Sequence, residues 1–198
     1  MPLNKPNRRV VLAGGAAAML PLPALALSDS AATSYVQSAI NDVLEIVNSG
    51  QSEARVLRRF KQVFTSYADI NIISRTVLGP PFRSLSTREQ SAFSDAFGSY
   101  ISNKYGRQFR EFRGSTITIT RSQNGGSKGV LVSSQVRQPG QSPYALDWQV
   151  SDRSGRTKLI NLIIEGLSLL TSEREEIRAQ LAARGGNVSA LTTYLASA

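Results

Sequence analysis

Apolar side chains between residues 35 and 112 recur every three or four positions, which is the period of an amphipathic helix. The pattern predicts four helices in this half of the chain. Asp69 is a suitable cap for the third, and Ser86 with Glu89 forms a capping box for the fourth. The predicted helices span residues 35–48, residues 53–66, a short stretch from Asp69 to the Gly79-Pro80-Pro81 stop, and residues 87–112.

From residue 116 the apolar positions alternate with polar ones, which is the period of a strand with one buried face. Asn124-Gly125-Gly126 and Pro139-Gly140 are turn sequences between these stretches. The pattern predicts a four-stranded antiparallel meander. Its strands span residues 116–120, 129–137, 144–150 and 159–164.

The fourth predicted strand is a nearly continuous apolar run, interrupted only by Asn161. Such a run predicts a strand buried on both faces. Gly166, just after it, predicts a bulge or a close backbone approach. We therefore expect this strand to lie between layers, with the function between those layers.

The end of the chain returns to a helical pattern. Ser172 and Glu175 have capping-box spacing, so a helix is expected over residues 172–183, followed by a short amphipathic piece with Leu191 and Leu195. Helices, then a meander, then helices predict an α+β fold in which the helices pack on one face of the sheet. We expect a single domain over residues 27–198.

The first residues have the order of an export signal. A basic region with Arg8 and Arg9 precedes the apolar residues 10–20, and Ala24-Leu25-Ala26 matches an A-x-A cleavage site. Residues 1–26 are therefore expected to be cleaved, and the arginine pair also resembles a twin-arginine signal. A short membrane anchor is the alternative, although the apolar segment is short for a span.

Two absences limit the chemistry. The chain has no Cys and no His, which excludes disulfides, thiol nucleophiles and His-based hydrolytic triads. Its formal charge of +9 falls to +6 once the basic residues of the predicted signal are removed. A net positive charge favours anionic partners or surfaces.

Several short motifs together resemble a known family. They are Leu78-Gly79, Leu85-Ser86, Phe93, Tyr105, Glu165-Gly166-Leu167-Ser168-Leu169, Arg174 and Gly185. The set resembles the MlaC family, also called the toluene-tolerance auxiliary family, of exported phospholipid carriers, over about residues 35–195. The Glu-Gly-x-Ser element is the most specific part, and a hopanoid-associated sister group shares it. The family usually has an aromatic residue near Thr157 and an Asp at the position of Asn161.

This resemblance implies an NTF2-like cone with a lipid cavity between sheet and helices, with phospholipid as cargo and no other cofactor or metal. Tyr105 and Trp148, which have polar tips, would suit the cavity mouth. Periodicity alone does not separate a hollow cavity from a filled core, so an ordinary core stays open as an alternative. The expected lipid-binding residues are Phe93, Phe97, Ile101, Tyr105, Val132, Leu146, Trp148, Leu162, Ile164 and Leu167.

Basic residues recur on two predicted helices, and either a docking surface or a solvated helix face would produce them. The docking candidates are Arg55, Arg58, Arg59, Arg107 and Arg110. Nucleic acid is not expected, because the chain is expected to be exported and no base-stacking platform stands out. Glu165 and Asp147 could form an acid/base pair, but a Glu165 that accepts backbone or Arg hydrogen bonds is favoured.

The resulting expectation is a monomeric periplasmic carrier without catalytic activity. As the resemblance implies, it would shuttle phospholipid between an inner-membrane MCE-type ABC transporter complex and an outer-membrane lipoprotein/porin complex, maintaining outer-membrane lipid asymmetry. The alternatives are a hopanoid-lipid carrier, a non-lipid adaptor, or a small enzyme on the same fold.

Overall fold

A computed structural model describes residues 27–198, apart from the side chains of Phe109 and Arg110. The predicted export signal and its cleavage site lie outside these described residues. The helices are α1 (Asp29–Asn48), α2 (Glu53–Tyr67), α3 (Ile70–Leu78), η1 (Pro80–Ser84), α4 (Thr87–Gly106), η2 (Gln108–Phe112), η3 (Gly126–Lys128), α5 (Leu169–Ala182) and α6 (Val188–Ser197). The strands are β1 (Thr116–Asn124), β2 (Val130–Arg137), β3 (Tyr144–Ser151), β4 (Lys158–Ile164) and β5 (Leu167–Ser168).

The strands form one antiparallel sheet in sequence order, which confirms the α+β class and the meander. The sheet has five strands, one more than predicted, because the chain folds back after Ile164 and pairs it with Leu167. Glu165 and Gly166 make this turn with φ values of 49° and 82°. Positive φ at both central residues is typical of a two-residue type I′ hairpin. Gly166 therefore serves a turn, and neither the predicted bulge nor a close backbone approach is found, since a Cβ there would meet nothing within 4 Å.

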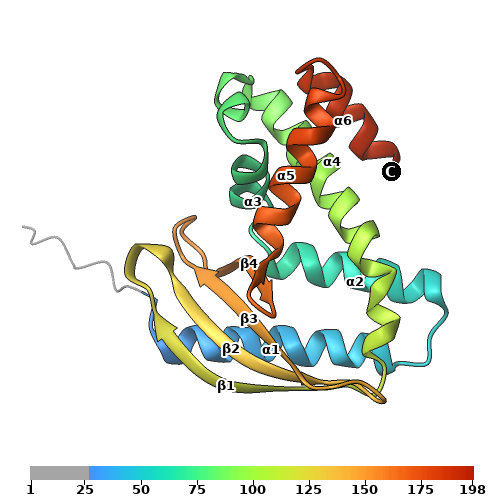
Figure 1. Cartoon of the computed structure of the whole chain (residues 1–198), viewed down its shortest axis with the longest axis vertical. Helices are drawn as coiled ribbons and strands as arrows, with labels where there is room; N and C mark the ends of the chain where they lie inside the picture. The colour runs from blue at the N-terminus through green and yellow to red at the C-terminus, as the bar shows by residue number, and fades with distance from the viewer. Residues whose placement is uncertain (1–26) are drawn as a thin grey trace, which may run out of the picture.

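One face of the sheet is covered by α1 (Figure 1). Val36 and Ile40 on α1 pack with Val132 and Val150 of the sheet in a core cluster whose members are at most 9% exposed. Residues of alternate position, such as Ser133, point to the opposite face of the sheet.

A second core lies among α3, α4, α5 and α6, which gather beyond the sheet in Figure 1. Phe93 and Phe97 of α4 stack here with ring centroids 6.2 Å apart. Ile177 and Leu191 complete the cluster, and each is fully buried. The described residues therefore form two packed regions, and α4 runs from the helical one down past α2 (Figure 1).

The longest predicted helix ends earlier than expected. Helix α4 stops at Gly106, and the chain continues as the 3₁₀ segment η2 to Phe112. A Cβ at Gly106 would lie 2.3 Å from Leu57 Cδ1, so α2 packs closely on α4 there and a larger residue would require the Leu57 side chain to move. Glycine is a weak helix former, which favours the change of helix type there.

Two helix starts also differ from the prediction. Helix α1 begins at Asp29, six residues before the predicted start, because Ser28 accepts a hydrogen bond from the Ala31 N–H. Helix α5 begins at Leu169 and not at Ser172, because Ser168 is the N-cap. No helix among the described residues is both long enough and apolar enough to cross a bilayer.

Candidate functional site

A cavity of about 580 Å³ lies between the inner face of the sheet and the helices. Its walls come from α1, α2, α3, α4, α5, η2 and the strands β1, β3 and β4, so it forms only when the helices pack on the sheet. Most of the lining is apolar. The apolar and aromatic lining residues are Ala39, Val43, Phe60, Val63, Phe64, Tyr67, Ala68, Ile73, Phe97, Ile101, Tyr105, Phe112, Ile117, Tyr144, Leu146, Trp148, Leu159, Ile160, Leu162, Ile164, Leu169 and Leu170.

Seven of the ten residues expected to bind lipid lie in this wall. The strand residues meet across neighbouring strands, since Trp148 pairs with Leu162 and Leu146 with Ile164. The seven are Phe97, Ile101, Tyr105, Leu146, Trp148, Leu162 and Ile164.

The other three predicted residues are not part of the cavity lining. Phe93 and Val132 are both fully buried in filled core, Phe93 among the helices and Val132 beneath α1. Leu167 is 72% exposed, because the two-residue turn before it directs it away from the cavity wall. An inward-facing position is therefore not sufficient to reach the cavity.

Strand β4 was predicted to be buried on both faces, but only Leu159 in it is fully buried. The rest of the strand is half-buried. Leu162 and Ile164 face the cavity, so hollow space replaces the packing that a filled core would supply.

Trp148 lies deep in the wall and not at a polar mouth as predicted. Its indole N–H donates to the Ser134 hydroxyl at 3.0 Å, and that hydroxyl donates to the Leu146 carbonyl at 2.7 Å. Trp148 is 6% exposed. The polar tip is thus satisfied inside the sheet layer, and the ring contributes apolar surface.

A charged cluster joins α4 to α5 beside the cavity. Lys104 Nζ lies 2.7 Å from Glu173 Oε1 and 2.7 Å from Glu176 Oε2. The Tyr105 hydroxyl donates to Glu173 at 2.5 Å, and the Tyr100 hydroxyl donates to Glu176 at 2.5 Å. This cluster was not predicted from the sequence. Its only sequence signal is the spacing of the two glutamates, which places them on the same face of a helix.

Burial and hydrogen bonds within this cluster shift the pKa values of its side chains. Hydrogen bonds from Lys104 and Tyr100 hold the pKa of Glu176 below its ordinary value. Burial alone would lower the pKa of Lys104, but its bonds to both carboxylates raise it instead. Burial raises the pKa of Tyr105, and the hydrogen bond to Glu173 raises it further. At neutral pH the cluster therefore contains a charged lysine, a charged Glu176 and neutral tyrosines.

A second polar group borders the cavity at α2. The Tyr67 hydroxyl donates to Asp42 at 2.7 Å, and the Tyr35 hydroxyl donates to the Tyr67 carbonyl at 3.0 Å. Burial and the hydrogen bond to Asp42 raise the pKa of Tyr67 to about 12. These bonds fix the Tyr67 ring, which lines the cavity.

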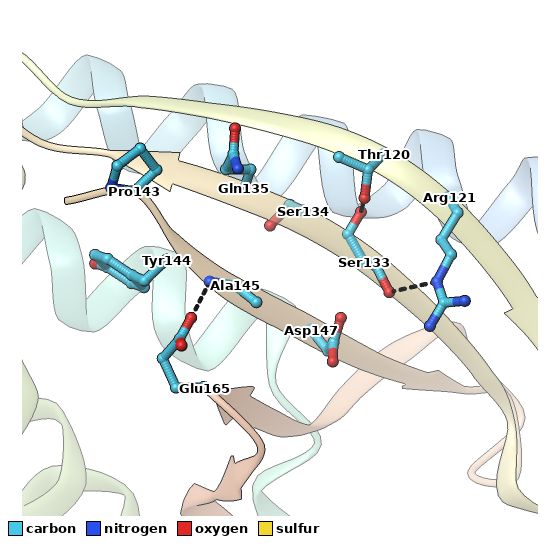
Figure 2. Close-up of a pocket in the computed structure, with 10 residues that line it drawn as sticks. All are labelled: Thr120, Arg121, Ser133, Ser134, Gln135, Pro143, Tyr144, Ala145, Asp147 and Glu165. Atoms are coloured by element: carbon cyan, nitrogen blue, oxygen red, sulfur yellow. Dashed lines mark hydrogen bonds between the residues drawn. The ribbon is translucent and has the colours of Figure 1, made fainter.

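A smaller polar pocket of about 360 Å³ contains both acids that could have formed a catalytic pair (Figure 2). Glu165 is directed at the backbone of Ala145, whose N–H donates to it, as the favoured interpretation predicted. Asp147 alternates with the cavity residues Leu146 and Trp148, so it belongs to the opposite face of the sheet. Among the described residues, no group of acidic side chains is arranged to hold a metal ion.

The docking candidates are on the surface. Arg55, Arg58 and Arg107 are exposed, whereas Arg59 is half-buried and bonds Glu45 of α1 at 2.8 Å. The side chain of Arg110 lies outside the described part of the chain. Arg59 is therefore engaged in a contact between α1 and α2.

Comparison with known proteins agrees with this architecture. A phospholipid-binding protein from Ralstonia solanacearum, solved in complex with a phospholipid, is similar in structure with a TM-score of 0.71. The two sequences are 24% identical, and the match covers 83% of this chain and 94% of the other. The model of the MlaC protein family matches residues 37–197, nearly all of the described chain. The chain therefore belongs to the MlaC family, as its Glu-Gly-x-Ser element predicted.

Proposed function

We propose that this protein is a periplasmic phospholipid carrier, in which the 580 Å³ cavity holds the acyl chains. The cavity carries the proposal, because a large apolar space inside a small domain has a cost unless something apolar occupies it. The volume lies within the range of about 300–1,000 Å³ found for small-molecule sites. A similar fold with a bound phospholipid in the Ralstonia protein, together with membership of the MlaC family, supports this function.

Carriage by this cavity would be a partition equilibrium and not a reaction. Each methylene group moved from water into an apolar site contributes about 0.8 kcal/mol. A chain of a dozen such groups would be held firmly, yet it could leave for another apolar site at little net cost. The proposed contacts are made by the seven cavity-lining residues named above, from Phe97 to Ile164.

The wider role in this proposal follows the family. After export and cleavage of residues 1–26, a monomer with an NTF2-like cone shape would shuttle phospholipid between an inner-membrane MCE-type ABC transporter complex and an outer-membrane lipoprotein/porin complex. This traffic would maintain outer-membrane lipid asymmetry. A hopanoid-related cargo, an adaptor without lipid and a small enzyme are the competing functions.

The test compares two tryptophan substitutions with native mass spectrometry of protein purified without added lipid. Leu162→Trp places a ring in the cavity, so it should displace phospholipid and leave the thermal midpoint nearly unchanged. Val132→Trp overpacks the filled core under α1, which costs about 1–3 kcal/mol, and should lower the midpoint. An unmutated protein that carries no phospholipid, even after incubation with vesicles, would contradict the proposal and favour the adaptor or the enzyme.

A further inference from the structure

Glu173 is the buried one of three acidic residues in the wall of a mostly apolar cavity, since Glu111 and Glu165 are exposed. It lines the cavity, yet it is only 4% exposed. Both of its donors reach the same oxygen, Oε1, with Lys104 at 2.7 Å and Tyr105 at 2.5 Å. The other oxygen, Oε2, is buried and receives no hydrogen bond from the described residues. A buried carboxylate oxygen without a donor is destabilising, so this arrangement calls for a reason.

The need to join α4 and α5 does not explain the unpaired oxygen of Glu173. Glu176, one turn further along α5, binds the same lysine and is satisfied at both oxygens, by Tyr100 at Oε1 and by Lys104 at Oε2. Glu176 is not part of the cavity lining. Of the two glutamates on this helix face, the one in the cavity wall therefore retains the unused acceptor.

The charge of the cluster points the same way. Lys104 is shared between two carboxylates, and the two tyrosines contribute only neutral hydroxyls. The cluster therefore has one cation for two acidic side chains, and its free acceptor belongs to the residue in the cavity wall. A ligand group that donates a hydrogen bond, charged or neutral, complements this oxygen, whereas a phosphate oxygen placed there would be repelled.

We propose that Glu173 Oε2 is a specificity site that accepts a hydrogen bond from a hydroxyl or primary ammonium group on the cargo lipid. This inference rests on the carrier function proposed above. The apolar part of the wall takes the acyl chains of the same molecule. The donor could come from the headgroup or from a hydroxylated chain, and the experiment separates these two sources.

The protein is equilibrated with two vesicle mixtures, and the bound lipid is extracted and quantified by mass spectrometry. The first mixture has equal amounts of phosphatidylethanolamine and phosphatidylcholine with identical chains. The two lipids then differ only in the headgroup, which carries N–H donors in phosphatidylethanolamine and none in phosphatidylcholine. The second has phosphatidylcholine with and without a chain hydroxyl. We expect about tenfold enrichment of the donor-bearing lipid in one of the two mixtures, the value of one charge-assisted hydrogen bond.

Glu173→Gln should abolish that enrichment, because Gln can keep its bonds at Oε1 while it presents an N–H group to the cavity. Glu176→Gln is the matched control, since it removes the same charge from the same lysine and should leave the enrichment intact. If Glu173→Gln folds poorly, Glu173→Leu removes the acceptor while matching the apolar wall, and it should also lose the enrichment.

Enrichment in neither mixture, or enrichment that survives both Glu173 variants, overturns the specificity site while the carrier function stands. Failure to take up lipid from either mixture overturns the carrier function itself.

Discussion

Two glycines with the same φ differ in their surroundings. Gly129 and Gly155 both have φ of 83°. A Cβ at Gly129 would lie 2.1 Å from the Val150 carbonyl oxygen, a backbone atom of the neighbouring strand, whereas a Cβ at Gly155 would meet nothing within 4 Å. Gly129→Ala should therefore carry both a conformational cost and a clash, and Gly155→Ala only the conformational cost of about 1–2 kcal/mol.

Urea unfolding of the two variants measures the difference directly. We expect Gly129→Ala to be less stable than Gly155→Ala by about 1–3 kcal/mol, the usual range for a forced rearrangement in packed structure. Equal losses would mean that β3 moves away from Gly129 without resistance.

The direction of a strand side chain could be predicted from the sequence, but its surroundings could not. Val132, Leu146 and Trp148 all follow the alternating pattern and all point to the inner face, as predicted. Only Leu146 and Trp148 reach the cavity, because α1 packs over Val132. The path of α1 across the sheet is a tertiary property that the period of the strands does not contain.

At the scale of elements, Asn161 of β4 holds the beginning of α5. Its Oδ1 accepts the Leu170 N–H at 3.0 Å, and its Nδ2 donates to the Ser168 hydroxyl at 3.0 Å. Asn161→Leu should therefore cost about 1–2 kcal/mol, the value of a lost helix cap. Asn161→Asp, the residue usual in the family, keeps the acceptor and adds a negative charge at a helix N-terminus, so it should be neutral or slightly stabilising.

Unfolding of both variants in urea, with helix content followed by circular dichroism, checks this prediction. The two substitutions should differ by at least the value of the cap. A stable Asn161→Leu variant would show that Ser168 alone is enough to begin α5.

The same contact explains why the start of α5 was predicted wrongly. The capping box of α4 was correct, since Ser86 and Glu89 bond each other locally, and the sequence contains that whole motif. Ser172 and Glu175 have the same spacing, but the helix already begins at Leu169. The N-cap is Ser168, and Asn161, which also bonds this first turn, comes from a preceding strand and reaches the helix only in the folded hairpin.

At the scale of the whole molecule, buried and half-buried tyrosines set an alkaline limit to stability. Tyr67 keeps its proton in the folded protein to a pKa of about 12, against an ordinary value of 10.0. The pKa values of Tyr35, Tyr100, Tyr105 and Tyr144 are also raised, each chiefly by burial. The unfolded chain releases these protons above pH 10 while the folded protein retains them. Their contribution is therefore full below pH 10 and declines as the pH rises.

The free energy of unfolding, measured in urea at several pH values, should fall steadily between pH 10 and pH 12. Tyr67→Phe removes one titrating group, so its curve should be shallower over that interval, although the lost bond to Asp42 makes it less stable at pH 8. Parallel curves for the variant and the unmutated protein would show that Tyr67 ionises equally in both states.

The charge on the surface leads to a prediction about docking. Arg55 and Arg58 are exposed on α2, and Arg153 and Arg156 are exposed in the turn between β3 and β4. Reversing either pair to Glu gives the same change in net charge, and exposed substitutions usually alter stability by about 0.5 kcal/mol or less. If the α2 face docks on the membrane complexes, Arg55→Glu with Arg58→Glu should slow lipid transfer while bound lipid is retained. The effect should be largest at low salt, because the Debye length shrinks from about 30 Å at 0.01 M to 10 Å at 0.1 M.

The Arg153 and Arg156 pair is the control. Equal slowing of lipid transfer by both pairs would indicate a response to net charge. No slowing by either pair would mean that the α2 arginines are a solvated helix face and not a docking surface.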